Sequence, residues 1–403
     1  MNTITPRLSD RQMAALLALL VAIMPFSVDA YLPSLPQIAA ALQADIHYIE
    51  KSLSSFILGV ACGQLLGGSL ADIKGRKNLA LAGLGVYMLG TLGLIFTQTA
   101  DQLLALRLVQ ALGAGMASVV VGAVVRDNYQ GKQAAQMFAL IGIIMMAAPS
   151  LAPMIGSLLQ AAGGWRAVFV FLLAYALLVF ALLSRFLPKH KAAEPFTRDM
   201  WHGVWARYRR VLSTRHALGF LFFQAASFSS MLVFLTESPF VYMKLYGLST
   251  HQYAWAFAGN ILMMALFNRI TAWRLKRDSN PQDILLWGII LQFSANLLLM
   301  VSAWNGLPPF WLLLLPVMVS VGTQGLIVAN TQALFMENFR EEGGSANALL
   351  LAGQSLVAAA AGFAATLLHN GTARVMTGLM FFCTLCGAAL LWGFSRQVLR
   401  TKR

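Results

Sequence analysis

The chain has 403 residues, of which 58% are hydrophobic and 11% are charged. Soluble globular domains carry roughly 25% charged residues, so this composition excludes a soluble fold and indicates a membrane protein. The net charge of +14 does not indicate a nucleic-acid partner, because the positive residues follow the membrane topology set out below. The three cysteines all fall in apolar segments, where we expect them to pack and not to bind a metal ion.

Apolar segments close to the spanning length of ~20 residues recur from one end of the chain to the other. Only helices satisfy the backbone hydrogen bonds of such segments inside a bilayer. We therefore predict an all-α membrane protein with twelve transmembrane helices, at residues 12–33, 49–71, 78–97, 101–125, 135–158, 165–186, 217–243, 250–273, 284–303, 308–335, 343–368 and 372–395.

The loops between these spans differ in their content of Lys and Arg. If both termini are cytoplasmic, the cytoplasmic loops and span ends hold 24 of the 29 Lys and Arg residues, the outer loops and span ends hold four, and Arg107 lies well inside a span. Cytoplasmic loops of membrane proteins carry such a positive excess. This distribution therefore predicts the orientation, and it also predicts contact with the anionic lipid of the inner leaflet.

Asp29 is the first charge inside an apolar span. No charged residue occurs from residue 13 to residue 28 before it. A carboxylate in a membrane span is costly and usually marks a proton or ion pathway. We therefore predict that Asp29 takes part in proton coupling.

The loop after the second span carries a motif, Gly-Ser-Leu-Ala-Asp-Ile-Lys-Gly-Arg-Lys, at residues 68–77. It resembles the Gly-x-x-x-Asp-x-x-Gly-Arg-Lys signature of the major facilitator superfamily. Gly68 allows close helix approach and Gly75 a tight turn, while Asp72 and Arg76 can form a charge-assisted pair. The resemblance implies a latch that holds the cytoplasmic side shut, with Asp127 as a further partner of Arg76. The alternative is a loop that is positive only because it is cytoplasmic.

The fourth span contains a second resemblance, to the family signature Arg-x-x-Gln-Gly. Arg107 and Gln110 match it, and Ala111 replaces the usual glycine. At 1.5 Å per residue, Arg107 and Asp29 lie about 9 Å and about 6 Å from the outer ends of their predicted spans. We therefore expect an ion pair between them, either as a switch in proton coupling or as a static structural pair.

The fifth span resembles the family's antiporter signature. Pro149, Pro153 and Gly156 match it, although both expected Gly-Pro steps are Ala-Pro here. Proline inside a helix kinks it and frees carbonyl groups. The motif favours export over uptake, and the alternative is an ordinary kinked helix.

The six spans at residues 1–187 and the six at residues 216–403 form two predicted bundles, joined by a linker at residues 188–215. Within the linker, the apolar residues of 196–212 recur at helical spacing among Arg and His side chains. That pattern predicts an amphipathic helix on the cytoplasmic leaflet. Two paired halves of six spans are the major facilitator arrangement, with the substrate site near the midplane.

The seventh span repeats the situation of the first, because Glu237 lies in it shortly before a proline and a tyrosine. We predict that Glu237 joins Asp29 and Arg107 in proton coupling. The run Asp-Ala-Tyr-Leu-Pro-Ser-Leu-Pro at residues 29–36 resembles the bicyclomycin-resistance branch of the superfamily, as does Ser-Pro-Phe-Val-Tyr at 238–242. The resemblance implies a monomeric drug:proton antiporter of a bacterial inner membrane, with no cofactor, no metal and no enzymatic activity.

Aromatic and Met side chains are suited to promiscuous ligands because they repack easily. Six residues that could line an apolar cavity are therefore candidates for the substrate site: Phe26, Tyr31, Met145, Met146, Phe234 and Tyr242. Each is equally compatible with ordinary packing. The six histidines fall in loops or near span ends, so we do not expect a histidine proton relay.

The leading functional prediction is proton-coupled efflux of small amphipathic, drug-like compounds by alternating access. An alternative keeps the fold and assigns it a metabolite, such as a purine or an amino acid. A membrane sensor is disfavoured because no soluble domain is present to signal through. No nucleophile motif, metal-ligand cluster or phosphate loop suggests an enzyme.

Overall fold

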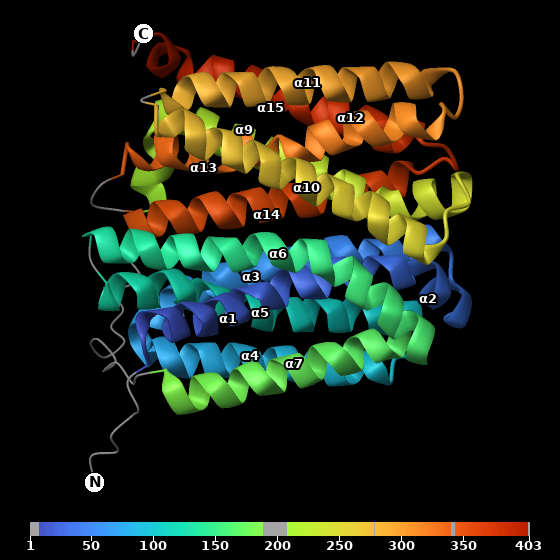
Figure 1. Ribbon diagram of the computed structural model, residues 1–403, viewed down its shortest axis with the longest axis horizontal. Helices are drawn as coiled ribbons and strands as arrows, with labels where there is room; N and C mark the ends of the chain where they lie inside the picture. The colour runs from blue at the N-terminus through green and yellow to red at the C-terminus, as the bar shows by residue number, and fades with distance from the viewer. Residues whose placement is uncertain (1–7, 130, 188–207, 278, 340–342, 402–403) are drawn as a thin grey trace. The chain divides into compact units, whose positions relative to one another are not determined.

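The computed structural model describes residues 8–129, 131–187, 208–277, 279–339 and 343–401 (Figure 1). The described residues form helices and no strand, as predicted. The longer helices are α1 (Asp10–Asp29), α3 (Ile46–Lys74), α4 (Arg76–Ile95), α5 (Ala100–Asn128), α6 (Gly131–Gly163), α7 (Trp165–Phe186), α9 (Arg215–Pro239), α10 (Thr250–Leu275), α11 (Pro281–Trp304), α12 (Phe310–Gly322), α13 (Gln324–Met336), α14 (Gly343–Leu368) and α15 (Arg374–Thr401). Shorter elements are the 3₁₀ segment η1 (Leu32–Ser34), α2 (Leu35–Ala41) and the π-helical segment η2 (Phe240–Leu245).

Helix boundaries follow local capping chemistry. Ser9 and Gln12 form a reciprocal capping box before α1, and Ser249 and Gln252 do the same before α10. Each box satisfies backbone N–H groups that have no partner within the helix. Gly75 has a φ of 81° between α3 and α4, which confirms the tight turn predicted there.

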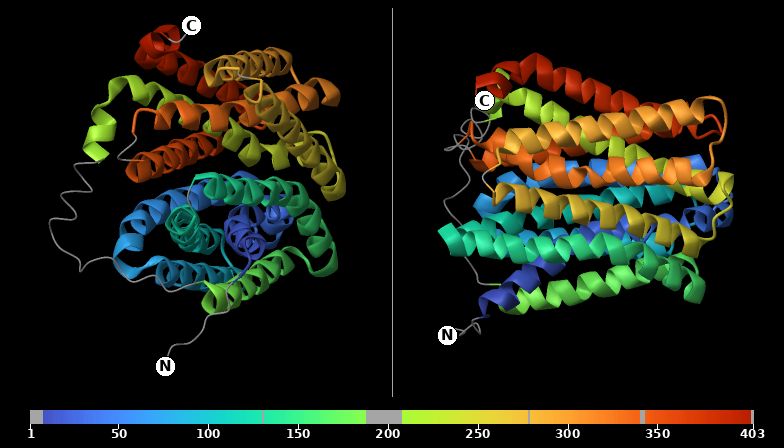
Figure 2. Two further views of the ribbon diagram at one scale, coloured as in Figure 1. Left: turned by 60° about the vertical axis from the view of Figure 1, so that its left-hand side comes forward. Right: turned by 45° about the horizontal axis from the view of Figure 1, so that its top comes forward.

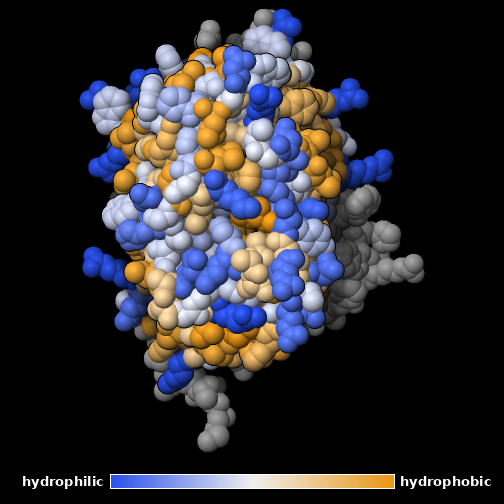
Figure 3. Space-filling view, turned by 90° about the vertical axis from the view of Figure 1, so that its right-hand side faces the viewer, coloured by the Kyte–Doolittle hydropathy of each residue, from blue (hydrophilic) through white to orange (hydrophobic). Residues whose placement is uncertain are grey.

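Nine helical segments within the described residues are long and apolar enough to cross a membrane. They coincide with nine of the predicted spans, and the other three predicted spans fall on α3, α6 and α10. The fold class is therefore an all-α membrane protein, while the full count of twelve spans stays a prediction. Figure 3 looks at one set of helix ends, where hydrophilic side chains are interspersed with apolar ones.

The first span is longer than the sequence predicted. Its helical path runs from Asp10 through η1 and α2 to Ala41, and not to residue 33. The reason is that Pro33 and Pro36 lie at the first positions of new helical segments, where proline needs no N–H partner. Asp29 therefore lies twelve residues before the end of the span, and not four as expected.

The chain forms two compact units. Unit 1 comprises Met1–Asp45 and Ser55–Met200, and unit 2 comprises Ile46–Ser54 and Trp201–Arg403. The first residues of α3 thus belong to unit 2, and the predicted division into bundles at residues 1–187 and 216–403 stays a prediction. Figures 1 and 2 show that the helices within each unit run side by side along a common direction.

Small residues allow close packing in unit 1. In α4 and α5, a Cβ at Gly83 would lie 2.8 Å from the Gly113 carbonyl oxygen, so the two backbones touch. Such small-residue contacts are the usual way in which membrane helices associate. In unit 2, α9 packs mainly against α14 and α15, around a core that includes Phe220, Phe223 and Phe335.

The predicted linker helix lies mostly outside the described residues. Only its end is described, and residues 208–213 are helical. The amphipathic helix at residues 196–212 therefore stays a prediction.

Candidate transport site

A break in the first span positions Asp29. α1 ends at Asp29, residues 30 and 31 form a turn, and η1 follows with Pro33. Gly156 of α6 lies directly against the backbone of Ala30, where a side chain would collide with the Ala30 carbonyl oxygen. The break and its glycine contact both lie in unit 1 and fix the backbone beside the carboxylate.

Asp29 is buried without a polar partner. Its residue surface is 6% exposed, and no hydrogen bond or ion pair reaches it within the described part of the chain. An unpaired charge in an apolar interior is costly, whereas a protonated carboxyl needs no counter-charge. The site can therefore hold a proton or receive a cationic group.

Arg107 does not pair with Asp29 in the described residues, so a switch between paired and unpaired states stays a prediction. Its Nη2 donates to the Ser27 carbonyl oxygen at 3.0 Å, and its Nη1 donates to Gln110 Oε1 at 2.7 Å. Its guanidinium also lies 4.4 Å from the ring centres of Tyr31 and Phe56. The reason is helical geometry: positions 27 and 29 are about 200° apart around α1, and Arg107 is bound on the side of Ser27.

A buried polar network surrounds Arg107 in unit 1. Gln110 Nε2 donates to Thr91 Oγ1 at 2.9 Å, and Thr91 Oγ1 donates to the Tyr87 carbonyl oxygen at 2.7 Å. Ser27 Oγ donates to the Ile23 carbonyl oxygen and lies 2.6 Å from Tyr87 Oη, which therefore acts as the donor. Ser27, Tyr87 and Thr91 were not among the predicted site residues, although polar side chains in apolar spans were the available signal.

Glu237 has a histidine partner that the sequence analysis did not expect. Its side chain is fully buried in α9, and its Oε2 lies 3.0 Å from Nδ1 of His369, which follows α14. His47, in the first turn of α3, stacks on His369 with ring centres 3.1 Å apart. Residues near span ends can thus reach Glu237, and the expectation that the histidines form no proton relay stays a prediction.

The candidate substrate residues are largely packed within their own units. Tyr31, Phe234 and Tyr242 are fully buried, and each lies within 6.0 Å of another aromatic ring, centre to centre. Phe26 is partly exposed and packs against Phe171 and Tyr175 of α7. The side chains of Met145 and Met146 lie outside the part of the chain that the structure describes. Their role in binding substrate stays a prediction.

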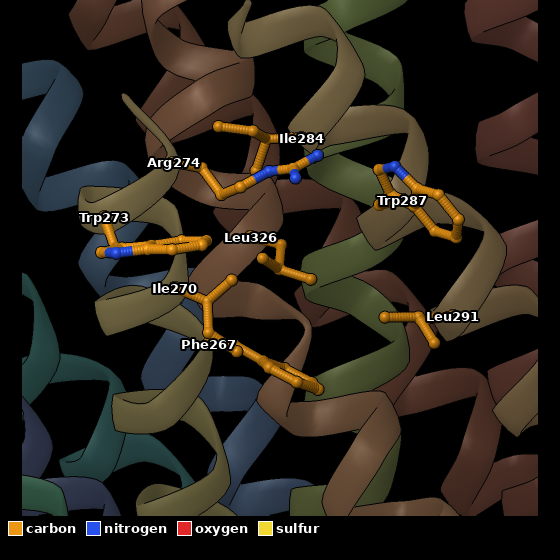
Figure 4. Close-up of a pocket in the computed structure, with 8 residues that line it drawn as sticks. All are labelled: Phe267, Ile270, Trp273, Arg274, Ile284, Trp287, Leu291 and Leu326. Carbon is orange, nitrogen blue, oxygen red and sulfur yellow. The ribbon is translucent and has the colours of Figure 1, made fainter. Parts of the chain in front are cut away.

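The described residues line two apolar pockets, neither of which contains a candidate substrate residue. One of about 340 Å³ lies between α10, α11 and α13 of unit 2. Figure 4 shows Trp273 and Trp287 on opposite sides of it and the Arg274 side chain extending across its upper part. Both tryptophans are about half exposed, which is typical of a groove facing lipid. The other pocket lies between α6 and α7 of unit 1.

The family of the protein follows from comparison with known sequences. The family model described as Major Facilitator Superfamily matches residues 17–362, most of the chain. The chain belongs to the Major Facilitator Superfamily. Two solved structures share its fold. A mutant of the peptide transporter POT in complex with sulfate has a TM-score of 0.75 and 15% identity, over 98% of this chain and 99% of the other. A mutant of the nucleoside transporter NupG has a TM-score of 0.74 and 14% identity, over 98% of this chain and 100% of the other.

Curated relatives of this superfamily member carry drug-resistance names. The chain is 28% identical over 386 residues to the bicyclomycin resistance protein homolog of Haemophilus influenzae, covering 96% of both chains. It is 27% identical over 374 residues to the multidrug resistance protein MdtL of Escherichia coli, covering 92% of this chain and 93% of that one. These findings indicate an integral membrane transporter and not an enzyme.

The superfamily latch motif is only partly described. Gly75 makes the predicted turn, and Arg76 begins α4 immediately after it. The surroundings of Gly68 and the side chains of Asp72 and Asp127 lie outside the part of the chain that the structure describes. The latch therefore stays a prediction.

The superfamily antiporter motif lies in α6, which runs continuously past Pro149 and Pro153. Of its three marked residues, Gly156 has the clearest structural consequence, because its missing side chain lets α6 touch the turn beside Asp29. The motif thus contacts the candidate proton site directly within unit 1.

Proposed function

We propose that the protein is a proton-coupled antiporter that exports small amphipathic compounds across a bacterial inner membrane. The single observation that carries the proposal is Asp29, buried beside a helix break with no polar partner among the described residues. A carboxylate in that position stays charged only at a high cost. A proton or a cationic substrate group relieves the same cost, and exchange between the two couples their opposite movements.

Arg107 supplies a fixed positive charge in the same unit. Its hydrogen bonds to Ser27 and Gln110 hold it in place whether or not Asp29 carries a proton. Protonation of Asp29 therefore changes the charge balance of the interior by one unit. Moving one charge across the membrane is worth about 2.3 kcal/mol per 100 mV, which is the order of energy that drives export against a gradient.

The relatives support the class of substrate. The printed names of the Haemophilus and Escherichia proteins concern resistance to bicyclomycin and to multiple drugs. We extend that to this chain as export of drug-like compounds. Glu237 remains a second candidate for proton coupling, and the protein acts as a monomer with its termini in the cytoplasm.

The decisive variant is Asp29→Asn, which preserves size but carries no proton-exchanging group. The matched control is Asp10→Asn, the same substitution at an exposed position on the same helix. Purified variants are reconstituted into liposomes with an imposed pH gradient, and substrate-induced proton flux is followed with a pH-sensitive dye. We expect loss of coupled flux in Asp29→Asn and full activity in Asp10→Asn.

The substrate panel tests the second half of the proposal. Antibiotics are compared with purines and amino acids in the same liposomes. Flux with antibiotics alone supports the efflux function, whereas flux with metabolites alone replaces it by the metabolite alternative. Undiminished gradient-driven export by Asp29→Asn would overturn the assignment of the proton site.

A further inference from the structure

We propose that unit 2 contains a binding site for a divalent transition-metal ion of the zinc class, formed by His47, Glu237 and His369. One ligand atom from each of these three residues lies within 4.8 Å of the others. The residues come from the start of α3, from α9 and from the end of α14. Two imidazoles and one carboxylate form the ligand set of many open zinc sites.

The carboxylate of Glu237 lacks a complete set of partners. Its Oε2 accepts from His369, but its Oε1 has no hydrogen-bond partner among the described residues, although the side chain is fully buried. A buried acceptor without a partner is costly. A cation bound at the carboxylate removes that cost, which a single hydrogen bond from His369 does not.

Outer contacts orient both imidazoles. His47 Nδ1 lies 2.9 Å from Glu50 Oε2, so its bond to a metal would come from Nε2. Metal-binding histidines usually engage a carboxylate in this way with the other ring nitrogen. Phe240 packs edge-on against both rings, at 4.7 Å from His47 and 4.6 Å from His369, and forms an apolar wall.

The metal ion would change the tautomer of His369. The Gly371 N–H donates to His369 Nε2 at 2.9 Å, so Nδ1 carries the proton that Glu237 accepts. Metal binding at Nδ1 would move this one proton to Nε2, with loss of the Gly371 contact. Because protons compete with a metal ion for imidazole and carboxylate ligands, binding weakens as pH falls.

Two of the three ligand atoms are already close to the spacing that a shared ion requires. Two ligands at ~2.1 Å in tetrahedral geometry are about 3.4 Å apart. The His369 and Glu237 atoms are 3.0 Å apart, so they separate by about 0.4 Å. His47 has to reorient, because its ring stacks on that of His369 and the three ligand atoms lie within 4.8 Å of one another.

Charge and access fit a divalent ion. The carboxylate of Glu237 supplies a negative charge beside two imidazoles, which suits a divalent ion. The side chain of His47 is 17% exposed, so the site is open at one edge, and three protein ligands leave a fourth position for water. Imidazole ligands favour zinc, nickel or copper over magnesium or calcium.

The experiment measures zinc binding to the purified full-length protein in detergent, after removal of metal with a chelator. Isothermal titration with Zn²⁺ at two pH values gives stoichiometry and affinity, with Mg²⁺ as the comparison ion. We expect one zinc ion per chain, tighter binding at the higher pH, and no Mg²⁺ binding. Glu237→Gln and His369→Asn each remove a ligand and weaken binding at least tenfold.

Two further variants make the result decisive. Glu50→Gln keeps all three ligands and removes the negative charge beside His47 Nδ1, so we expect a 10- to 100-fold weaker affinity. His251→Asn, at an exposed position in unit 2, is the matched control and leaves binding unchanged. Absence of zinc binding, equal binding by Glu237→Gln and the control, or equal binding of Mg²⁺ overturns the site. Because the assay measures no transport, its outcome is independent of the proposed efflux function.

Discussion

Gly156→Ala tests how the antiporter motif supports the proton site. A Cβ at this position would meet the Ala30 carbonyl oxygen and lie 2.8 Å and 2.9 Å from the carbonyl carbon and Cα of Ala30. Contacts below 3.0 Å are essentially never seen for a real Cβ, and here the opposing atoms are backbone. Either α6 or the turn after Asp29 has to move, and overpacking of this kind costs roughly 1–3 kcal/mol.

Gly122→Ala in α5 is the matched control, because nothing lies within 4 Å of a Cβ there. Both substitutions gain the same helix propensity, about 1 kcal/mol, so that gain cancels when the two variants are compared. The difference between them is therefore the steric term alone, roughly 1–3 kcal/mol, or about 5- to 150-fold in the folded-to-unfolded ratio.

The assay is denaturant-induced unfolding in mixed detergent micelles, together with proton-driven transport in liposomes. We expect Gly156→Ala to be less stable than Gly122→Ala by that amount and to transport more slowly, because the displaced turn carries Asp29. If both variants unfold within about 0.5 kcal/mol of each other and transport equally, α6 does not position the proton site.

Two other substitutions test the polar contacts. Arg107→Lys replaces the planar guanidinium and loses at least one of its two charged hydrogen bonds, so the free energy of unfolding should fall by about 2 kcal/mol. The control, Arg185→Lys, lies at an exposed position and should change that free energy by nothing measurable. Unfolding in detergent compares the two variants. The Tyr246 hydroxyl donates to the Pro308 carbonyl oxygen at 2.6 Å, and burial raises the pKa of Tyr246 from 10.0 to about 12. Because the folded pKa is the higher one, this stabilisation is fully present below pH 10 and is lost as pH rises toward about 12. Tyr246→Phe should be about 1 kcal/mol less stable than the parent protein at neutral pH. Because phenylalanine does not titrate, the variant should also lose less stability than the parent as pH rises toward about 12. An unchanged pH profile of unfolding would contradict the assignment.

The sequence predicted what depends on composition and local chemistry. Long apolar runs predicted the membrane helices, and Gly75 predicted the turn between α3 and α4, because each property resides in the residues themselves. The antiporter motif pointed to Gly156, although the sequence could not show that its contact is the backbone of Ala30.

Side-chain pairing could not be predicted in the same way. Equal depth in the membrane suggested an Asp29–Arg107 pair, but depth does not specify which face of a helix a residue occupies. The rotation of α1 gives Arg107 the Ser27 carbonyl oxygen instead. His369 was set aside because it lies near a span end, yet Glu237 lies close enough to that end of unit 2 to accept its hydrogen bond.

The segments around Asp29 and Glu237 resemble each other in their irregular backbone and differ in the side chains that contact the two carboxylates. Asp29 precedes a turn and a 3₁₀ segment, and Glu237 precedes Pro239 and the π-helical segment η2. Irregular backbone of this kind is tolerated in a membrane only where protein surrounds it, and π-helical turns are frequent at functional sites. The chemistry at the two positions differs, since Asp29 has no polar partner in the described chain while Glu237 is already bound to His369. A proton or a substrate cation is therefore the natural partner of Asp29, whereas a cation at Glu237 has to compete with an imidazole proton. That difference predicts that Asp29→Asn acts on coupled transport, whereas Glu237→Gln acts first on metal binding.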